Sequence, residues 1–176
     1  MGQYHEIADK AVDNYGYITA AEATAMGIAL KDVFEWEHSG RLEKVGRGVW
    51  RLAHCPCTDY DHYAESIALV GPKSWIWGES VLAMHNLALV NSPYVYVATA
   101  RRVRRNLPEW LKIVKLPKDA ALDDFNGIPC QNLAAVFVEH KKSLMLDRLL
   151  QGIKEATNQS LLTVDDMKVL RKEFNI

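Results

Sequence analysis

Hydrophobic residues in the first forty positions recur at helical spacing, in three stretches separated by glycines. From residue 3 to 14 the apolar positions fall every three or four residues, which predicts an amphipathic helix that ends before Gly16. Thr19 then opens the sequence TAAE, in which Glu22 completes the pattern of a capping box, so a short helix is expected over about 20–26. Gly27 ends that helix, and a third helix is expected over 29–39, before Gly40.

The pattern changes to that of paired strands after Gly40. RLEKV and VWRL flank the glycine-bounded sequence GRG at 46–48, which predicts a strand, a tight turn and a second strand. Because side chains alternate between the faces of a strand, we expect Leu42, Val45 and Val49 to contact the helices and several cations to point outward. This order of elements is that of a winged helix-turn-helix, with the third helix as recognition helix and the hairpin as wing. The alternative is a small helical bundle with a surface hairpin.

The rest of the chain mixes helical and strand-like segments. Strands are expected over 74–77, 94–100, 110–117 and 128–130, and helices over 59–70, 79–87, 131–139, 143–157 and after Thr163. Gly71-Pro72 and Asn126-Gly127 separate these segments. The fold class expected is therefore α+β, with a winged helix-turn-helix at 1–52, a linker at 53–58 and a mixed α/β domain at 59–176.

Composition and charge narrow the possible partners. The 176 residues are 49% hydrophobic and 24% charged with a net charge of −1, which is ordinary for a globular protein. No apolar run approaches the ~20 residues of a membrane span, and the N-terminal residues lack the apolar stretch of a signal peptide. Three cysteines fit reduced thiols, so a cytoplasmic location without membrane association is expected.

Charge is distributed unevenly along the chain. Residues 1–52 hold six Lys+Arg and eight Asp+Glu, or −2; residues 53–118 hold eight and five, or +3; residues 119–176 hold seven and nine, or −2. A surface that binds nucleic acid must therefore be a local cluster of cations rather than the whole protein.

The segment from Gly16 to Leu52 resembles the N-terminal winged helix of AbiEi-type antitoxins, the transcriptional-repressor half of type IV toxin–antitoxin systems. The resemblance rests on Gly16, Ile18, Thr19 and Gly27, and on the sequence GRLEKVGRGVWR at 40–51, where Trp50 replaces the usual tyrosine. WIWGESVLAMHNL and FNGIPCQNLAAVFVEH are similar to strand–helix segments of the family's second domain. The resemblance implies a repressor of its own operon that counteracts a cognate nucleotidyltransferase-like toxin.

The expected recognition helix is unusually acidic, with Lys31 against Asp32, Glu35 and Glu37. The spacing allows two orientations of this helix. In the first, Val33 and Trp36 face inward, and the exposed residues are Leu30, Lys31, Phe34, Glu35 and His38. In the second, the inward residues are Leu30, Val33, Phe34 and Glu37, and the exposed residues are Lys31, Asp32, Glu35 and Trp36. Either orientation places a carboxylate near phosphates and weakens the attraction, although a carboxylate can accept a hydrogen bond from cytosine N4. The alternative is a winged helix that has become a protein-interaction module.

The cations of the wing are the strongest candidates for contacts with DNA. Arg47 lies between two glycines at the tip, and we hypothesise that it borders a minor groove while Arg41 and Lys44 bind phosphates. The sequence ARRVRRN at 100–106 is a second DNA contact, a partner surface or a solvated loop. Double-stranded DNA with an inverted repeat, bound by two copies, is the expected partner. The candidate DNA-binding residues are Lys31, Phe34, Glu35, His38, Arg41, Lys44, Arg47, Arg51, Arg101, Arg102, Arg104 and Arg105.

Other chemistry finds little support in the sequence. His54, Cys55, Cys57 and His62 lack the spacing of a zinc site, so a linker with incidental thiols is expected. The chain has no G-x-S-x-G elbow and no phosphate-binding glycine motif. His85 is expected to be a hydrogen-bonded core histidine. We therefore expect no catalytic residues, no cofactor and no metal.

Overall fold

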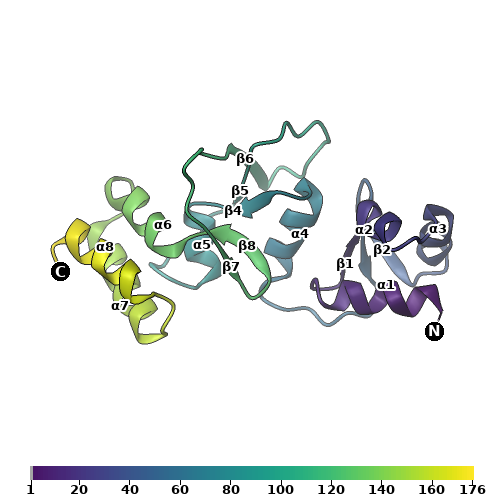
Figure 1. The fold of residues 1–176 in the computed structure, drawn as a ribbon, viewed down its shortest axis with the longest axis horizontal. Coiled ribbons are helices and arrows are strands. Elements are labelled where there is room, and N and C mark those ends of the chain that lie inside the picture. Colours follow the sequence, from purple (N-terminus) through teal and green to yellow (C-terminus); the bar gives the residue numbers. More distant parts are fainter. Residues whose placement is uncertain (1) are drawn as a thin grey trace. The chain divides into compact units, whose positions relative to one another are not determined.

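The computed structural model describes residues 2–176 (Figure 1). The chain folds into two compact units. Unit 1 runs up to Pro72 and also includes Val103–Leu107, and unit 2 comprises Lys73–Arg102 and Pro108–Ile176. Both units mix helices with a sheet, which confirms the α+β fold class. The assignment of separate functions to residues 1–52 and 59–176 stays a prediction.

Unit 1 contains a winged helix-turn-helix, as predicted. A three-stranded antiparallel sheet has the strand order β1-β3-β2. The elements in chain order are α1 (Gln3–Val12), β1 (Tyr17–Thr19), α2 (Ala20–Ala25), α3 (Leu30–His38), β2 (Leu42–Gly46), β3 (Val49–Leu52) and α4 (Asp61–Val70). Strand β1 was not predicted, because three residues are too few to show a period of two; it forms by pairing Ile18 with Trp50 of β3.

The turn between α2 and α3 forms as the sequence predicts. The Thr19 side chain accepts a hydrogen bond from the Glu22 backbone N–H, and the Glu22 carboxylate accepts one from the Thr19 N–H. Two of the N–H groups at the start of α2 would otherwise lack a partner, so this capping box fixes where the helix begins. Gly27 follows the helix with a φ of +74°, the left-handed conformation that glycine adopts most readily.

Helices α1, α2 and α3 pack on one face of the small sheet. The core on that face contains Ile7, Ala11, Ile18, Ala23, Ile28, Val33, Leu42, Trp50 and Leu52. The prediction that the wing contacts these helices is confirmed for Leu42, whereas Val49 is not part of this core. Val49 is buried, yet Trp50 and Leu52 are the β3 residues in the helix-packed core, and alternation along β3 directs Val49 to the other face.

Helix α4 lies against that other face. The Tyr17 hydroxyl of β1 donates a hydrogen bond of 3.2 Å to the Glu65 carboxylate. A Cβ on Gly46 of β2 would come within 2.5 Å of the Leu69 side chain, so β2 and α4 approach closely here. Burial, and secondarily the Glu65 charge, raise the pKa of Tyr17, which keeps its hydroxyl protonated as a donor.

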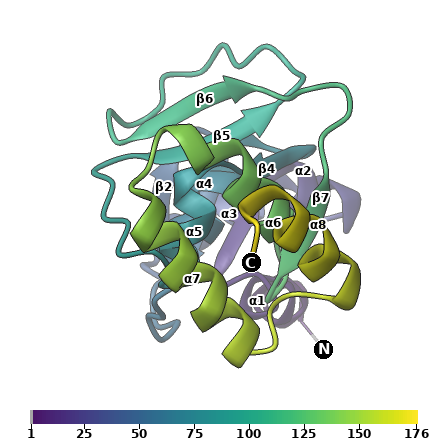
Figure 2. The same ribbon diagram turned by 90° about the vertical axis from the view of Figure 1, so that its left-hand side faces the viewer.

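Unit 2 is built on a five-stranded mixed sheet with the strand order β6-β5-β4-β8-β7. The pairs β5–β6 and β4–β8 are parallel, whereas β4–β5 and β7–β8 are antiparallel. Figure 2 shows α7 and α8 beside each other at the C-terminal end. The elements are β4 (Ser74–Ile76), α5 (Glu79–Met84), β5 (Val95–Thr99), β6 (Leu111–Lys115), β7 (Leu122–Phe125), β8 (Ile128–Gln131), α6 (Leu133–Glu139), a 3-10 turn (His140–Lys142), α7 (Leu146–Asn158) and α8 (Val164–Phe174).

Two features of unit 2 differ from the sequence prediction. Strand β7 was not predicted, because its sequence LDDF is acidic and largely exposed; it forms by pairing with β8 across the Asn126-Gly127 turn. Gln131 was expected in a helix but ends β8, and α6 begins after Asn132, whose side chain accepts from the Ala135 N–H. The Thr163 cap of α8 is confirmed. Within residues 2–176, no helix is both long and apolar enough to cross a bilayer.

Candidate nucleic-acid interface

The orientation of α3 decides which of its side chains are available to DNA. Val33 is fully buried, and Trp36 packs against the core with its ring edge-to-face with Tyr4, 5.4 Å between centroids. Leu30 and Phe34 are 39% and 50% exposed. The structure therefore has the first of the two orientations that the sequence left open, with Lys31, Phe34, Glu35 and His38 all on the exposed face.

One carboxylate of the acidic helix α3 accepts a hydrogen bond from the wing. Glu37 Oε2 accepts a hydrogen bond of 2.6 Å from Trp50 Nε1, and the Phe34 ring lies edge-to-face with Trp50 at 5.8 Å. Trp50 itself is 2% exposed. The sequence signal for this contact was the tryptophan at a position where the resembling family has tyrosine, since an indole N–H can only donate and needs an acceptor when buried. Glu37 thus joins the recognition helix to the wing.

The wing presents cations at its turn. Gly46 pairs with Val49, so Arg47 and Gly48 form a two-residue turn in which Gly48 has a φ of +71°. The register shifts between Lys44 and Gly46, and Lys44 and Arg47 are both exposed. At the base of β2, the exposed Arg41 guanidinium lies 5.0 Å from the centre of the Tyr4 ring. The tip and outer edge of the wing therefore carry three of its four cations.

Arg51 lies in a different environment from the other wing cations. Its guanidinium forms an ion pair of 2.8 Å with Asp61 of α4, in which the two side chains are 14% and 15% exposed. The same nitrogen donates to the Cys55 carbonyl at 3.1 Å, and the guanidinium lies 5.8 Å from the centre of the Tyr17 ring. These contacts tie β3 to α4 and to the segment that joins them.

The four arginines at 101–105 are exposed but divided between the two units. Arg101 and Arg102 belong to unit 2, whereas Arg104 and Arg105 belong to unit 1. Arg105 Nη1 donates a hydrogen bond of 3.0 Å to the Leu69 carbonyl in the last turn of α4. Carbonyls at a helix C-terminus lack an intrahelical donor, so Arg105 stabilises the end of α4.

The histidines do not form a metal site among the residues that the structure describes. Within the part of the chain that the structure describes, no group of three or more His, Cys, Asp or Glu side chains is placed to hold a metal ion. The His85 ring packs against the Phe125 ring with 3.9 Å between ring centres and a tilt of 44°, and burial lowers the pKa of His85 to about 4. The prediction of a hydrogen-bonded core histidine is wrong for His85 Nδ1, which is buried with no partner among residues 2–176.

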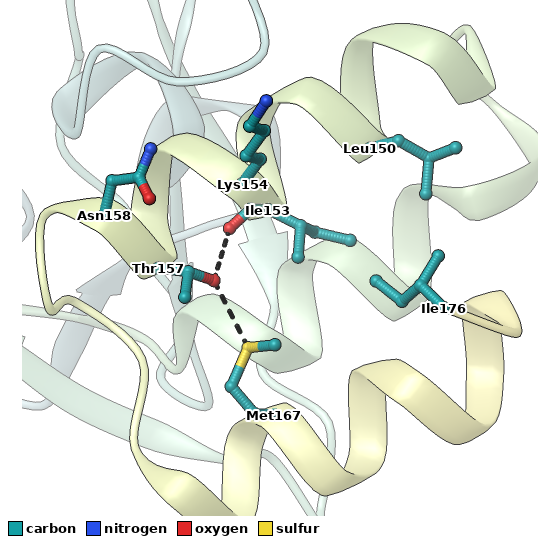
Figure 3. A pocket seen from close by; sticks show the side chains of 7 residues that line it. All are labelled: Leu150, Ile153, Lys154, Thr157, Asn158, Met167 and Ile176. Atoms are coloured by element: carbon teal, nitrogen blue, oxygen red, sulfur yellow. Dashed lines mark hydrogen bonds between the residues drawn. The ribbon is translucent and has the colours of Figure 1, made fainter.

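Unit 2 also has an apolar cavity of about 310 Å³ between α7 and α8 (Figure 3). Leu150 and Ile153 of α7 face Met167 and Ile176 across it. Thr157 Oγ1 donates to the Ile153 carbonyl at 2.7 Å and lies 3.3 Å from Met167 Sδ. These mostly apolar side chains are suited to packing of the two helices rather than to catalysis.

A capped helix, a second helix with an exposed face and a cation-tipped hairpin define a winged helix-turn-helix protein. Residues 5–53 match the family model described as a transcriptional regulator, AbiEi antitoxin. This match confirms, over the winged helix, the resemblance seen in the sequence, and it indicates a regulator of the antitoxin type. A search of curated proteins finds no match.

Proposed function

We propose that the protein is a DNA-binding repressor of its own operon and counteracts a cognate toxin. The observation that carries this proposal is the exposed face formed by α3 and the wing within unit 1. Arg47 extends from a tight turn that lets the backbone approach a sugar–phosphate chain, and Lys44 lies beside it. The family match over residues 5–53 supports the same assignment.

The proposed DNA contacts differ in role according to the element that carries them. The exposed face of α3 enters a major groove, where it reads base edges. Arg41 and Lys44 bind phosphates and Arg47 borders the minor groove, which positions the protein on the duplex. Arg51 supports this arrangement from within, because its guanidinium is held by Asp61. Arg101, Arg102, Arg104 and Arg105 provide a second, weaker contact with the phosphate backbone. The proposed α3 contacts are Lys31, Phe34, Glu35 and His38.

Two copies bind an inverted repeat, because a two-fold operator presents the same half-site twice. The toxin partner is nucleotidyltransferase-like, and residues 59–176 carry the function that opposes it. This part of the proposal rests on the resemblance to the AbiEi-type family.

The experiment is a binding titration with the DNA upstream of the protein's own operon. Fluorescence anisotropy at about 50 mM and about 200 mM salt should show a specific complex that weakens by at least roughly 100-fold, as expected for the about four phosphate contacts that Arg41 and Lys44 of two copies make. A shuffled duplex of the same length and composition is the control. The absence of a complex at the lower salt concentration, or equal binding to the shuffled duplex, would contradict repression by direct binding.

A second function is favoured by one observation. Leu30 and Phe34 expose apolar surface beside Glu35 on α3, a combination that suits a protein partner as well as a base pair. If unit 1 is instead a protein-interaction module, Phe34→Ala abolishes binding to the partner encoded in the same operon and the upstream DNA gives no complex. If DNA is the partner, the same variant weakens the DNA complex.

A further inference from the structure

We propose that unit 2 binds an organic cation, a guanidinium or ammonium group, in a cavity at the ends of β4 and β8. The cavity has a volume of about 360 Å³. Its walls include Trp77 and Gly78 just after β4, Tyr96 of β5, and Glu139 and His140 at the end of α6. This site goes beyond the proposed DNA-binding function, because none of the residues that line the cavity is a proposed DNA contact.

The position of the cavity in the fold is one that suits a ligand. Strands β4 and β8 are parallel neighbours, and Trp77-Gly78 and Gln131 lie at their carboxyl ends. In α/β sheets, ligands bind outside the carboxyl ends of the strands. Gly78 has a φ of +59° and a ψ of −134°, and a Cβ there would lie 3.1 Å from His140 Nε2. A side chain at this position would therefore be strained and would crowd the imidazole.

A buried amide holds two parts of the wall in place. Gln131 is 3% exposed, and its two polar atoms are both satisfied. Its Oε1 accepts from the Gly78 N–H at 3.0 Å, and its Nε2 donates to Glu139 Oε2 at 2.7 Å. The Glu139 carboxylate is thus oriented before any ligand arrives, which reduces the entropy lost on binding.

The imidazole of His140 provides an acceptor for a ligand N–H. The Ser143 hydroxyl donates to the His140 carbonyl at 3.3 Å, so its oxygen is free to accept from His140 Nδ1, 3.0 Å away. With the proton on Nδ1, Nε2 carries a lone pair. Nε2 is buried and has no hydrogen-bond partner among residues 2–176. A buried acceptor without a partner costs free energy, which a ligand N–H would recover.

The charge of the wall selects a cation. Glu79 and Glu139 supply two carboxylates, and none of the described residues that line the cavity is Lys or Arg. Trp77 and Tyr96 add aromatic rings, whose faces attract cations. Lys141 follows His140 in sequence, but its ammonium group donates to the Glu173 carbonyl and lies over the Phe174 ring. Acceptors and aromatic faces together fit a group that is positively charged and rich in N–H donors.

The test uses the full chain and two probes of nearly the same shape, Nα-acetyl-L-arginine amide and Nα-acetyl-L-citrulline amide (hereafter arginine amide and citrulline amide). The acetyl group removes the α-ammonium charge, so only the side chains differ in charge. Citrulline replaces the charged guanidinium by a neutral urea. In ¹H–¹⁵N NMR spectra we expect arginine amide to cause saturable chemical-shift changes at the Gly78 backbone N–H and the Trp77 indole N–H. Citrulline amide should bind at least about tenfold more weakly, which is one decade in Kd. Equal binding of the two probes, or no saturation by about 20 mM arginine amide, would overturn the proposal.

Two variants test the wall itself. Glu139→Gln removes the charge at nearly constant shape and should weaken arginine amide at least about tenfold. Glu155→Gln removes a carboxylate that is bonded to Gln151 on α7, outside the cavity, and should leave binding unchanged. Unchanged affinity in Glu139→Gln would overturn the proposal.

A third probe, the blocked tripeptide Ala-Arg-Ala, separates two sources of the cation. Binding as tight as that of arginine amide assigns the site to a basic side chain of a partner protein. Exclusion of the tripeptide assigns it to a free small molecule, and either result supports a cation site.

Discussion

Trp50 in the wing donates its indole N–H to Glu37 in the recognition helix across 2.6 Å. The indole is almost fully buried between the helices and the sheet, so its N–H must find its acceptor inside the protein. This bond sets the position of the wing relative to α3. It also withdraws one of the three carboxylates of α3 from the exposed face, which moderates the repulsion of phosphates by an acidic helix.

We expect Glu37→Ala to lower the free energy of unfolding by about 1–3 kcal/mol, because the buried Trp50 N–H loses a charged acceptor. Urea unfolding followed by circular dichroism measures this difference. Glu35→Ala is the matched control on the same helix, since Glu35 is exposed, and its effect should stay within about 0.5 kcal/mol. Equal effects of the two substitutions would show that the bond contributes nothing to stability.

Replacing Arg47 by Ala should weaken binding to the upstream DNA and reduce the slope of log K against log salt by about 0.9 for each phosphate that the variant no longer binds. Anisotropy titrations at four or more salt concentrations give both quantities. Lys10→Ala removes an exposed cation from α1, which belongs to neither α3 nor the wing, and should change neither quantity. An unchanged affinity and slope for Arg47→Ala would remove the wing tip from the interface.

The ion pair between Arg51 and Asp61 should contribute to stability rather than to DNA binding. A double-mutant cycle of Arg51→Ala and Asp61→Ala is expected to give a coupling of about 1–2 kcal/mol, because both side chains are largely buried. The exposed pair Asp165–Lys168 has the same length of 2.8 Å and should give less than about 0.5 kcal/mol. A large loss of DNA affinity in folded Arg51→Ala, with no loss of stability, would instead assign Arg51 to the interface.

Two glycines with positive φ provide a test of close packing. Gly16 and Gly27 have φ values of +86° and +74°, so alanine is strained at both and should cost about 1 kcal/mol at each. At Gly16 the new Cβ would also meet the Cβ of Cys55 at 2.8 Å, whereas at Gly27 nothing lies within 4 Å. Thermal unfolding should therefore show a clearly larger loss for Gly16→Ala than for Gly27→Ala, and similar losses would contradict the packing of Cys55 on Gly16.

The half-buried His85 should make the free energy of unfolding depend on pH. Burial lowers its pKa from 6.5 to about 4, against a smaller opposing effect of Asp123. Between these two pH values the unfolded chain binds a proton that the folded chain does not, so stability is full above about pH 6.5 and falls as the pH drops toward 4. Urea unfolding of the wild type and of His85→Gln at pH 7 and pH 5 measures this, and the variant should show the smaller dependence. An equal dependence in both proteins would assign the effect to other groups.

Much of unit 1 could be predicted because its signals are local. The capping box at Thr19 and Glu22, the glycine after α2 and the GRG turn each act within a few residues, and all three appear in the structure. Strand β1 could not be predicted, because three residues become a strand only through pairing with β3. The same reason applies to β7, whose acidic sequence is stabilised as a strand by β8.

The candidate interface divides in the same way. The sequence by itself determined which residues are cationic, where the wing turns and that α3 is amphipathic, since these depend on residue type and spacing. Only the tertiary structure decided which face of α3 is exposed, that Glu37 is bound by Trp50 and that Arg51 is paired with Asp61. Each of these depends on side chains at least ten positions apart in sequence, and no local pattern encodes a contact that forms only when separate elements pack together.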